Sequence, residues 1–129
     1  MILLDTHVLV WLQQEPRKLS RAADSTVRRA RTSSSLAISA ISLVELVSWF
    51  GRGRLRTTGT IEDTIRHFSE EIDVLPVSYE VAVTTSYFSL DSLPDPMDRI
   101  IAATARVEGI PLVTADERVQ KSPLVKTIW

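Results

Sequence analysis

The sequence contains no cysteine, only two histidines and only four glycines among its 129 residues. Without cysteine the chain has no disulfides, no thiolate metal site and no cysteine nucleophile, and this composition fits a reducing compartment. Two histidines alone do not supply the nitrogen and sulfur ligands of a structural zinc site. These absences exclude disulfide-stapled and zinc-stapled folds.

Long apolar runs and an excess of one charge are also absent. No stretch approaches the ~18 apolar residues of a membrane span. The apolar start MILLDTHVLVWL is interrupted by Asp5 and lacks the basic segment and cleavage site of a signal peptide. A net charge of −1 argues against a protein that coats nucleic acid through bulk positive charge. We therefore expect a cytoplasmic protein with one domain over residues 1–129.

Short apolar segments alternate with amphipathic segments along the whole chain. The expected strands are residues 2–4, 36–41, 74–77, 110–114 and 125–129, and the expected helices are 8–15, 20–32, 42–51, 60–71, 78–90 and 96–108. Strand–helix alternation with short connections implies right-handed crossovers and a mostly parallel sheet. The pattern predicts the α/β class, as a three-layer α/β/α sandwich.

Four acidic residues are expected at one edge of this sheet, where the carboxyl ends of parallel strands form ligand sites. Asp5 ends the first strand, Glu45 lies one helical turn after the second, and Asp98 is in the first turn of helix 96–108. Asp116 follows the strand at 110–114. Two carboxylates about 4 Å apart repel by about 4 kcal/mol at an effective dielectric near 20. A cation shared among these acids would compensate that repulsion.

Each acid also has a local explanation. Glu45 completes the S-x-x-E pattern of a capping box with Ser42, and Asp98 stands three residues after an expected N-cap. Three acids fit cap or turn positions on their own: Asp5, Asp95 and Asp116. Local caps do not explain why four acids should gather at one sheet edge, because like charges there cost energy.

The residues around these acids resemble the motifs of a known family. DTHVLVW, SLVEL, DPMDRIIAATA and PLVTADERV occur in this order along the chain. They are similar to the motifs of PIN-domain ribonucleases and, more narrowly, of VapC-type toxins of bacterial and archaeal toxin–antitoxin pairs. The resemblance extends from Met1 almost to Trp129.

The resemblance implies a PIN-like fold with an acidic pocket that binds Mg²⁺ or Mn²⁺ and hydrolyses RNA phosphodiester bonds. Matching positions assign four metal-binding and catalytic acids: Asp5, Glu45, Asp98 and Asp116. Thr6 and Thr114 match polar positions that support the pocket. Asp95 and Glu117, which neighbour two of the acids, are alternative holders of a metal-bound water.

Carboxylate oxygens suit Mg²⁺, which usually retains several waters and is held by one or two carboxylates. Our hypothesis is that Asp5 and Asp98 hold the main ion and that Glu45 shapes its shell or orients a water. Asp116 would assist a second ion or the substrate. This chemistry needs no serine, cysteine or histidine nucleophile.

Basic residues are concentrated in one part of the chain. Nine of the 15 lie between residues 17 and 56, where only two acids occur: Arg17, Lys18, Arg21, Arg28, Arg29, Arg31, Arg52, Arg54 and Arg56. The segment GRGRLR is the best candidate for RNA phosphates, through Arg52, Arg54 and Arg56, because guanidinium groups bind phosphate bidentately. Its alternative interpretation is a solvated loop.

The family resemblance also implies partners. VapC-like proteins generally form homodimers and are inhibited by a cognate VapB-like antitoxin. Trp11, Trp49 and Phe50 are possible anchors for such a peptide or members of the core. His7 lies close to Asp5 and is a candidate for contact with the substrate, but we rather expect it to pack or to support the acids. We expect His67 at the surface or at its boundary.

Other functional classes fit less well. A dinucleotide-binding module needs a glycine-rich turn after its first strand, and DTHVLVW has none. A receiver domain needs a phosphorylatable aspartate at the end of strand three, where this chain has VLPVS. The remaining alternative is a PIN-like module that binds RNA or a protein without cleaving.

Overall fold

The computed structural model describes residues 1–57 and 59–129, and within them the chain forms a five-stranded sheet with helices on both faces. The strands are β1 Ile2–Leu4, β2 Leu36–Ser39, β3 Asp73–Leu75, β4 Leu112–Val113 and β5 Thr127–Ile128. Their order is β3-β2-β1-β4-β5, and every neighbouring pair is parallel. The predicted mostly parallel sheet is therefore confirmed, with β1 at its centre.

Seven α-helices surround this sheet in the described part of the chain. They are α1 Thr6–Gln14, α2 Arg21–Thr32, α3 Ala40–Gly51, α4 Ile61–Ser69, α5 Tyr79–Thr84, α6 Pro96–Glu108 and α7 Glu117–Gln120. Two 3₁₀ turns, Pro16–Lys18 and Thr85–Tyr87, follow α1 and α5. No helix among the described residues has the length and apolar character needed to cross a membrane.

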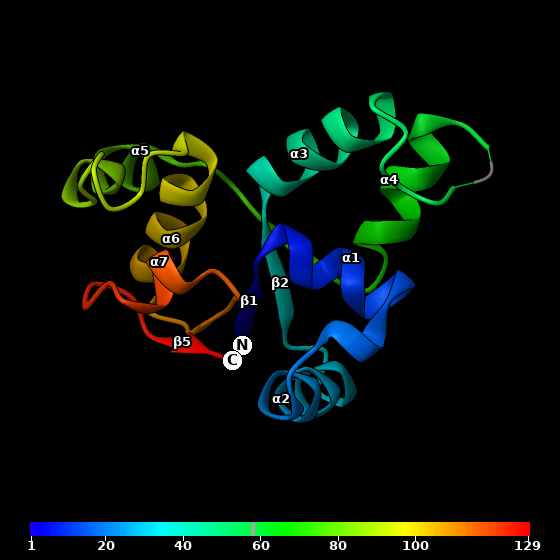
Figure 1. The fold of residues 1–129 in the computed structure, drawn as a ribbon, viewed down its shortest axis with the longest axis horizontal. Coiled ribbons are helices and arrows are strands. Elements are labelled where there is room, and N and C mark those ends of the chain that lie inside the picture. The colour runs from blue at the N-terminus through cyan, green and yellow to red at the C-terminus, as the bar shows by residue number, and fades with distance from the viewer. Residues whose placement is uncertain (58) are drawn as a thin grey trace.

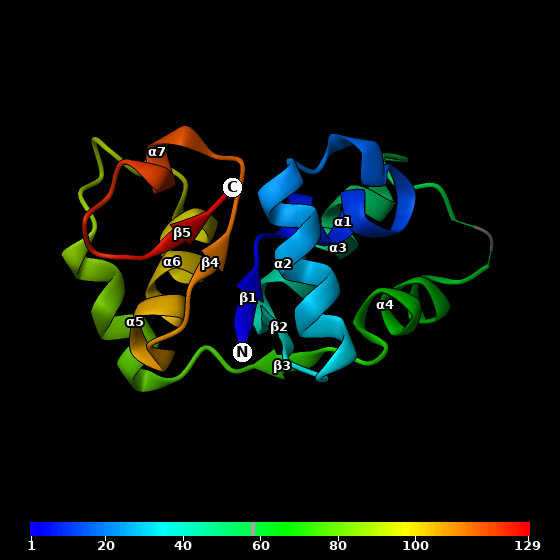
Figure 2. The same cartoon turned by 90° about the horizontal axis from the view of Figure 1, so that it is seen from below.

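The helices form the two outer layers of a three-layer α/β/α sandwich, as predicted. Figure 1 shows α1 and α2 on one side of β1 and β2, and α5, α6 and α7 on the other. The same separation is visible after a quarter turn in Figure 2. Alternating strand residues explain it, because Leu4 packs in the cluster with α1 and α2, whereas Leu3 packs in the cluster with α5 and α6.

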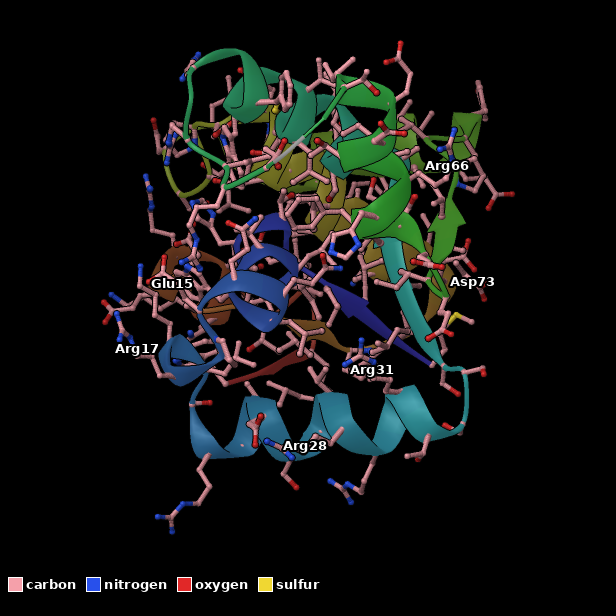
Figure 3. The ribbon with its side chains drawn as sticks, turned by 90° about the vertical axis from the view of Figure 1, so that its right-hand side faces the viewer. Glu15, Arg17, Arg28, Arg31, Arg66 and Asp73 are labelled. Atoms are coloured by element: carbon pink, nitrogen blue, oxygen red, sulfur yellow. The ribbon has the colours of Figure 1, made fainter. Side chains whose placement is uncertain are left out.

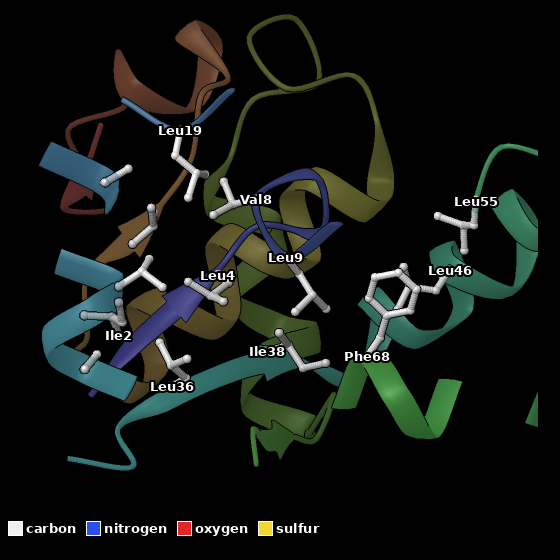
Figure 4. Packing of buried hydrophobic residues seen from close by; sticks show 14 of the residues in the cluster. Ile2, Leu4, Val8, Leu9, Leu19, Leu36, Ile38, Leu46, Leu55 and Phe68 are labelled. Carbon is white, nitrogen blue, oxygen red and sulfur yellow. The ribbon is translucent and has the colours of Figure 1, made fainter. Parts of the chain in front are cut away.

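The larger core cluster lies between the sheet and the helices α1 to α4. Leu9 of α1 and Ile38 of β2 are fully buried there, and Phe68 reaches in from α4 (Figure 4). This packing fixes α1 directly after β1. It thereby fixes the position of the residue between them, Asp5.

Several predicted boundaries differ from the structure. Strand β2 ends at Ser39, whose hydroxyl accepts a hydrogen bond from Ile41 N at 3.2 Å and caps α3. The predicted capping box of Ser42 with Glu45 is therefore wrong, and Ser42 is a buried residue inside α3. The sequence pattern missed this because two serines stand three residues apart and either could start the helix.

Other elements are shorter than the sequence pattern indicates, or were not predicted. Helix α5 ends at Thr84 and continues as a 3₁₀ turn, instead of extending to residue 90. The four-residue helix α7 was not predicted, since one turn gives no periodicity to read. Ser20, Ser78 and Asp95 cap α2, α5 and α6 as predicted. Gly109 ends α6 with a left-handed φ of 65°.

The core packing leads to a stability prediction. Replacing the fully buried Leu9 by alanine should lower the free energy of unfolding by about 2–5 kcal/mol, through lost transfer energy and a cavity. Leu90 is 68% exposed and serves as the matched control, and Leu90→Ala should change stability by less than about 0.5 kcal/mol. Urea unfolding monitored by circular dichroism measures both. Equal losses in the two variants would contradict the described core.

Candidate active site

Segments far apart in the sequence form one pocket of about 400 Å³ at the carboxyl edge of the sheet. Its lining residues come from the start of α1, from α3, from the start of α6 and from the turn after β4: Asp5, His7, Trp11, Glu45, Asp95, Asp98, Ala115, Asp116 and Arg118. The structure thus brings all four sequence-predicted acids to one pocket. Their catalytic and metal-binding roles remain predictions.

Asp5 is placed by the pairing of β1 with β4. Its backbone N donates to Val113 O at 3.0 Å, which continues the ladder past the end of β1. Its carboxylate Oδ2 accepts a hydrogen bond from Thr114 Oγ1 at 2.7 Å, across 109 residues of sequence. Asp5 occupies the N-cap position of α1, but its carboxylate is directed to β4 and not to the helix. Burial raises the pKa of Asp5, although this hydrogen bond opposes the effect.

Glu45 is held by a pair of buried hydroxyl groups. Thr6 Oγ1 lies 2.7 Å from Glu45 Oε1 and 2.8 Å from Ser42 Oγ. Thr6 is placed to donate to either oxygen, and because a threonine hydroxyl has one proton, it donates to Glu45 or to Ser42 at any one time. Thr6 and Ser42 are both fully buried. Burial also raises the pKa of Glu45, and the hydrogen bond from Thr6 partly offsets this.

Asp98 is the acid whose protonation is most perturbed by the pocket. Burial is the largest cause, followed by repulsion from Asp5, Asp95, Asp116 and Glu45, and together they raise its pKa to about 7. A carboxyl group with this pKa is half protonated near neutral pH. Strongly perturbed groups in a pocket are typical of functional sites.

Asp116 and Asp95 have structural roles in addition to lining the pocket. Asp116 caps α7 by accepting from Arg118 N at 2.9 Å, and it forms an ion pair with Arg118 Nε at 3.7 Å. Asp95 caps α6 by accepting from Met97 N at 2.9 Å. Glu117, the other alternative acid, is exposed and is not among the residues described as lining the pocket.

Helix N-termini partly stabilise this concentration of negative charge. Asp5 precedes α1, and Asp95 and Asp98 lie at the start of α6. The N-terminus of a helix carries about half a positive charge, and nearby carboxylates are stabilised by about 0.3–1 kcal/mol. This is smaller than the combined effect of burial and of repulsion among the acids, so the pKa of Asp98 stays raised.

The donor set fits a hard divalent cation. All the acidic ligands available are carboxylate oxygens, which Mg²⁺ and Mn²⁺ prefer. Among the described residues, no three histidine, aspartate or glutamate side chains are arranged to hold one ion together.

The arginine segment lies beside the end of α1 and outside the acidic pocket. Arg54 and Arg56 line a hollow of about 460 Å³ together with Arg17 and Glu15, and Arg52 is exposed nearby. Figure 3 shows Glu15 and Arg17 together at this end of the molecule. Gly53 has a φ of 68° and terminates α3, with the next backbone N donating to Trp49 O. That glycine therefore serves helix termination.

Aromatic residues connect the hollow and the pocket. The ring of His7 lies 4.6 Å from that of Trp49 and 5.8 Å from that of Trp11 (centroid distances). Trp49 is buried in the core, which leaves it little free surface as a peptide anchor, whereas Phe50 and Trp11 are both partly buried against the same cluster. His7 packs beside these two rings, of Trp49 and Trp11, while staying exposed, and His67 is exposed as predicted.

Sequence reasoning missed two residues of the site. Arg118 lines the acidic pocket, and Ser42 supports Glu45 through Thr6. Arg118 follows the fourth acid by two residues, but its position depends on the short helix α7. Ser42 was assigned to a cap because its pattern with Glu45 has a simpler local explanation.

Comparisons with known proteins identify the family. Residues 2–123 match the PIN domain, so the chain belongs to the PIN-domain family, as its motifs indicated. Ribonuclease VapC22 of Mycobacterium tuberculosis is 32% identical over 130 residues, which cover 99% of this chain and 98% of that protein.

Solved structures agree on the fold. VapBC2 from Rickettsia felis, bound to a DNA fragment from its promoter, matches with a TM-score of 0.73 at 19% identity, over 98% of this chain and 97% of that chain. DNA-bound VapBC from Salmonella typhimurium matches with a TM-score of 0.72 at 20% identity, over 98% and 95%.

The raised pKa of Asp98 leads to a prediction on stability. Its pKa is about 7 in the folded protein and ordinarily 3.8, so the folded state binds this proton more tightly between these values. Ionising Asp98 therefore destabilises the fold. The full cost applies above pH 7, and no cost applies at a pH well below 4. Asp98→Asn should stabilise the protein by about 1–2 kcal/mol at pH 8, after discounting for solvent screening.

Chemical denaturation at pH 4 and pH 8 measures this effect. The gain should be much smaller at pH 4 than at pH 8. Asp91 is an exposed aspartate outside the pocket, and Asp91→Asn is the matched control with little effect at either pH. A gain for Asp98→Asn that does not depend on pH would refute the electrostatic explanation.

Proposed function

We propose that this PIN-domain protein is a divalent-metal-dependent endoribonuclease, a toxin that a cognate VapB-like antitoxin neutralises. The observation that carries the proposal is the meeting of five carboxylates from four separate segments around one pocket. Burial raises the pKa of Asp5 and Glu45, and with repulsion that of Asp98. A fold that needed these acids only as caps would not concentrate them. The similarity to Ribonuclease VapC22 supports RNA as the substrate.

In this proposal Asp5 and Asp98 hold Mg²⁺ or Mn²⁺, with Glu45 and Asp116 beside them. When bound, the ion would activate a water for attack on phosphorus and neutralise charge on the phosphate. Thr114 keeps the carboxylate of Asp5 in place through its 2.7 Å hydrogen bond.

Two further groups act from the pocket wall. Thr6 orients Glu45 toward the pocket, where its carboxylate can accept a proton from a water. Arg118 offers a guanidinium group in a pocket lined mainly by acids, where it can bind a phosphate oxygen.

The partners of this protein follow from the same proposal. The relatives solved as VapBC complexes support a VapB-like antitoxin, and we propose a homodimer as the assembly. Trp11 is half-buried and, unlike Phe50, is among the residues described as lining the acidic pocket, so we propose it as the aromatic anchor for an antitoxin segment. Co-purification with the product of the neighbouring gene would test this partner.

The proposed activity predicts metal-dependent cleavage of RNA. Purified protein incubated with total RNA and Mg²⁺ or Mn²⁺ should produce new RNA ends, which sequencing maps, and EDTA should abolish them. Asp5→Asn and Asp98→Asn should lower the cleavage rate by at least about 10²-fold, because each removes a ligand from the metal or substrate. Circular dichroism establishes that both variants are folded.

The control for these variants is Asp91→Asn, which should cleave like the wild type. Full activity in Asp98→Asn would remove this residue from the mechanism. RNA binding without any cleavage by the wild-type protein would favour the alternative, a catalytically silent PIN-like module.

The arginine segment predicts a separate effect on affinity. Replacing Arg52 and Arg54 by glutamate should weaken RNA binding by about tenfold or more and reduce its dependence on salt, since two phosphate contacts are lost. Metal-dependent stabilisation should stay unchanged. Arg29→Glu, on the exposed face of α2, tests for a general charge effect and should change affinity less. Equal affinity of the double variant and the wild type would count against this surface.

A further inference from the structure

Two aromatic side chains, His7 and Trp11, line the acidic pocket. They extend from the first two turns of α1, directly after Asp5. His7 lines the pocket and is exposed even though its ring packs beside two indole rings, so part of this side chain is accessible there. Trp11 is half-buried.

Further aromatic and cationic side chains pack against these two rings. Trp49, which contacts His7, is buried and also lies 5.2 Å from the guanidinium carbon of Arg54. Trp11 lies 6.0 Å from the ring of Trp129 and has Lys18 Nζ 5.6 Å from its centroid. The pocket wall is therefore an aromatic surface supported by neighbouring rings, and a cation contacts each of the indole rings of Trp11 and Trp49.

The charge of His7 lowers the pKa of Asp5, against the larger effect of burial, which raises it. Among the described residues His7 forms no ion pair within 4.0 Å, although five carboxylates line the same pocket. The closest described ring contacts of His7 are the indole rings of Trp49 and Trp11. From the pocket, contacts lead from the carboxylates and Arg118 to the rings of His7 and Trp11. They continue to Lys18, which contacts Trp11 and pairs with Glu15 at 3.2 Å, and to Arg54, which contacts Trp49.

This order matches the groups of a nucleotide chain. A phosphate at the acidic pocket, a base on the aromatic wall and a following phosphate near the cations would each meet a suitable partner. Base–aromatic stacking is typical of sites that bind unpaired nucleotides. We propose that His7 and Trp11 form a nucleobase subsite, in which the base next to the scissile phosphate of RNA stacks on His7.

The inference rests on the proposed ribonuclease function and adds how the substrate is held. Stacking on His7 needs a base whose face is free, and the bases of a duplex are already stacked on their neighbours. The subsite therefore selects a nucleotide that is unpaired at the cleaved position.

The test uses a short RNA that spans a mapped cleavage site, with 2-aminopurine next to the cleaved bond. It is bound to the Asp98→Asn protein, so that the RNA stays intact. Stacking should quench the fluorescence of the 2-aminopurine. In this background, His7→Leu should restore the fluorescence and weaken binding about tenfold, as expected for one lost base stack.

Matched variants separate stacking from folding. His7→Phe keeps a ring of similar bulk and should retain both quenching and affinity, within about twofold. His67→Ala removes the other exposed histidine, on α4, and should change neither. On an RNA with an abasic site at the probed position, His7→Leu should leave the affinity unchanged, because no base remains there to stack.

Two results would overturn the inference while leaving the proposed function intact. One is RNA cleavage by the wild type without quenching at either nucleotide beside the cleaved bond. The other is an unchanged affinity in His7→Leu, or an equal loss on the abasic RNA, which would make His7 a structural residue. Absence of cleavage of any RNA by the wild type would instead overturn the proposed function, and this inference with it.

Discussion

Repulsion among carboxylates at one sheet edge is the constraint on which the site depends. Parallel strands end at the same edge, and the central position of β1 brings Asp5 next to the end of β4. The start of α6 and the first turns of α3 add Asp98 and Glu45. Burial raises the pKa of each of these three acids, so the folded protein holds them at an energetic cost.

Buried hydroxyl groups keep these acids in place despite that repulsion. Thr114 donates to Asp5, and Thr6 donates to Glu45 with Ser42 behind it. Hydrogen bonds to a carboxylate favour its charged form and fix its direction. The strand ends and α3 thus supply both the acids and their supports, which makes the pocket rigid on the side of Asp5 and Glu45. Asp98 is positioned chiefly by the start of α6.

Local signals in the sequence predicted the fold well, and non-local geometry explains what they missed. A run of apolar residues predicted the strand at residues 2–4, and an N-cap residue and a terminal glycine predicted α6. Such signals could be read from the sequence because they depend only on neighbouring residues. The four acids could be grouped since parallel strands share an edge. The roles of Ser42 and Arg118 could not be predicted, because each depends on contacts that only the packed α3 and the short α7 create.

The pKa of Asp98 connects the electrostatics of the pocket with its proposed chemistry. Near neutral pH this carboxyl carries a proton for about half of the time, so a proton and a cation compete for the same oxygens. Each relieves the repulsion from Asp5 and the other acids. Only a cation also leaves the carboxylate ionised and attracts phosphate. A pocket that is strained by its own charge therefore favours a divalent ion, and its affinity for the ion should rise as the pH increases through 7 and level off above it.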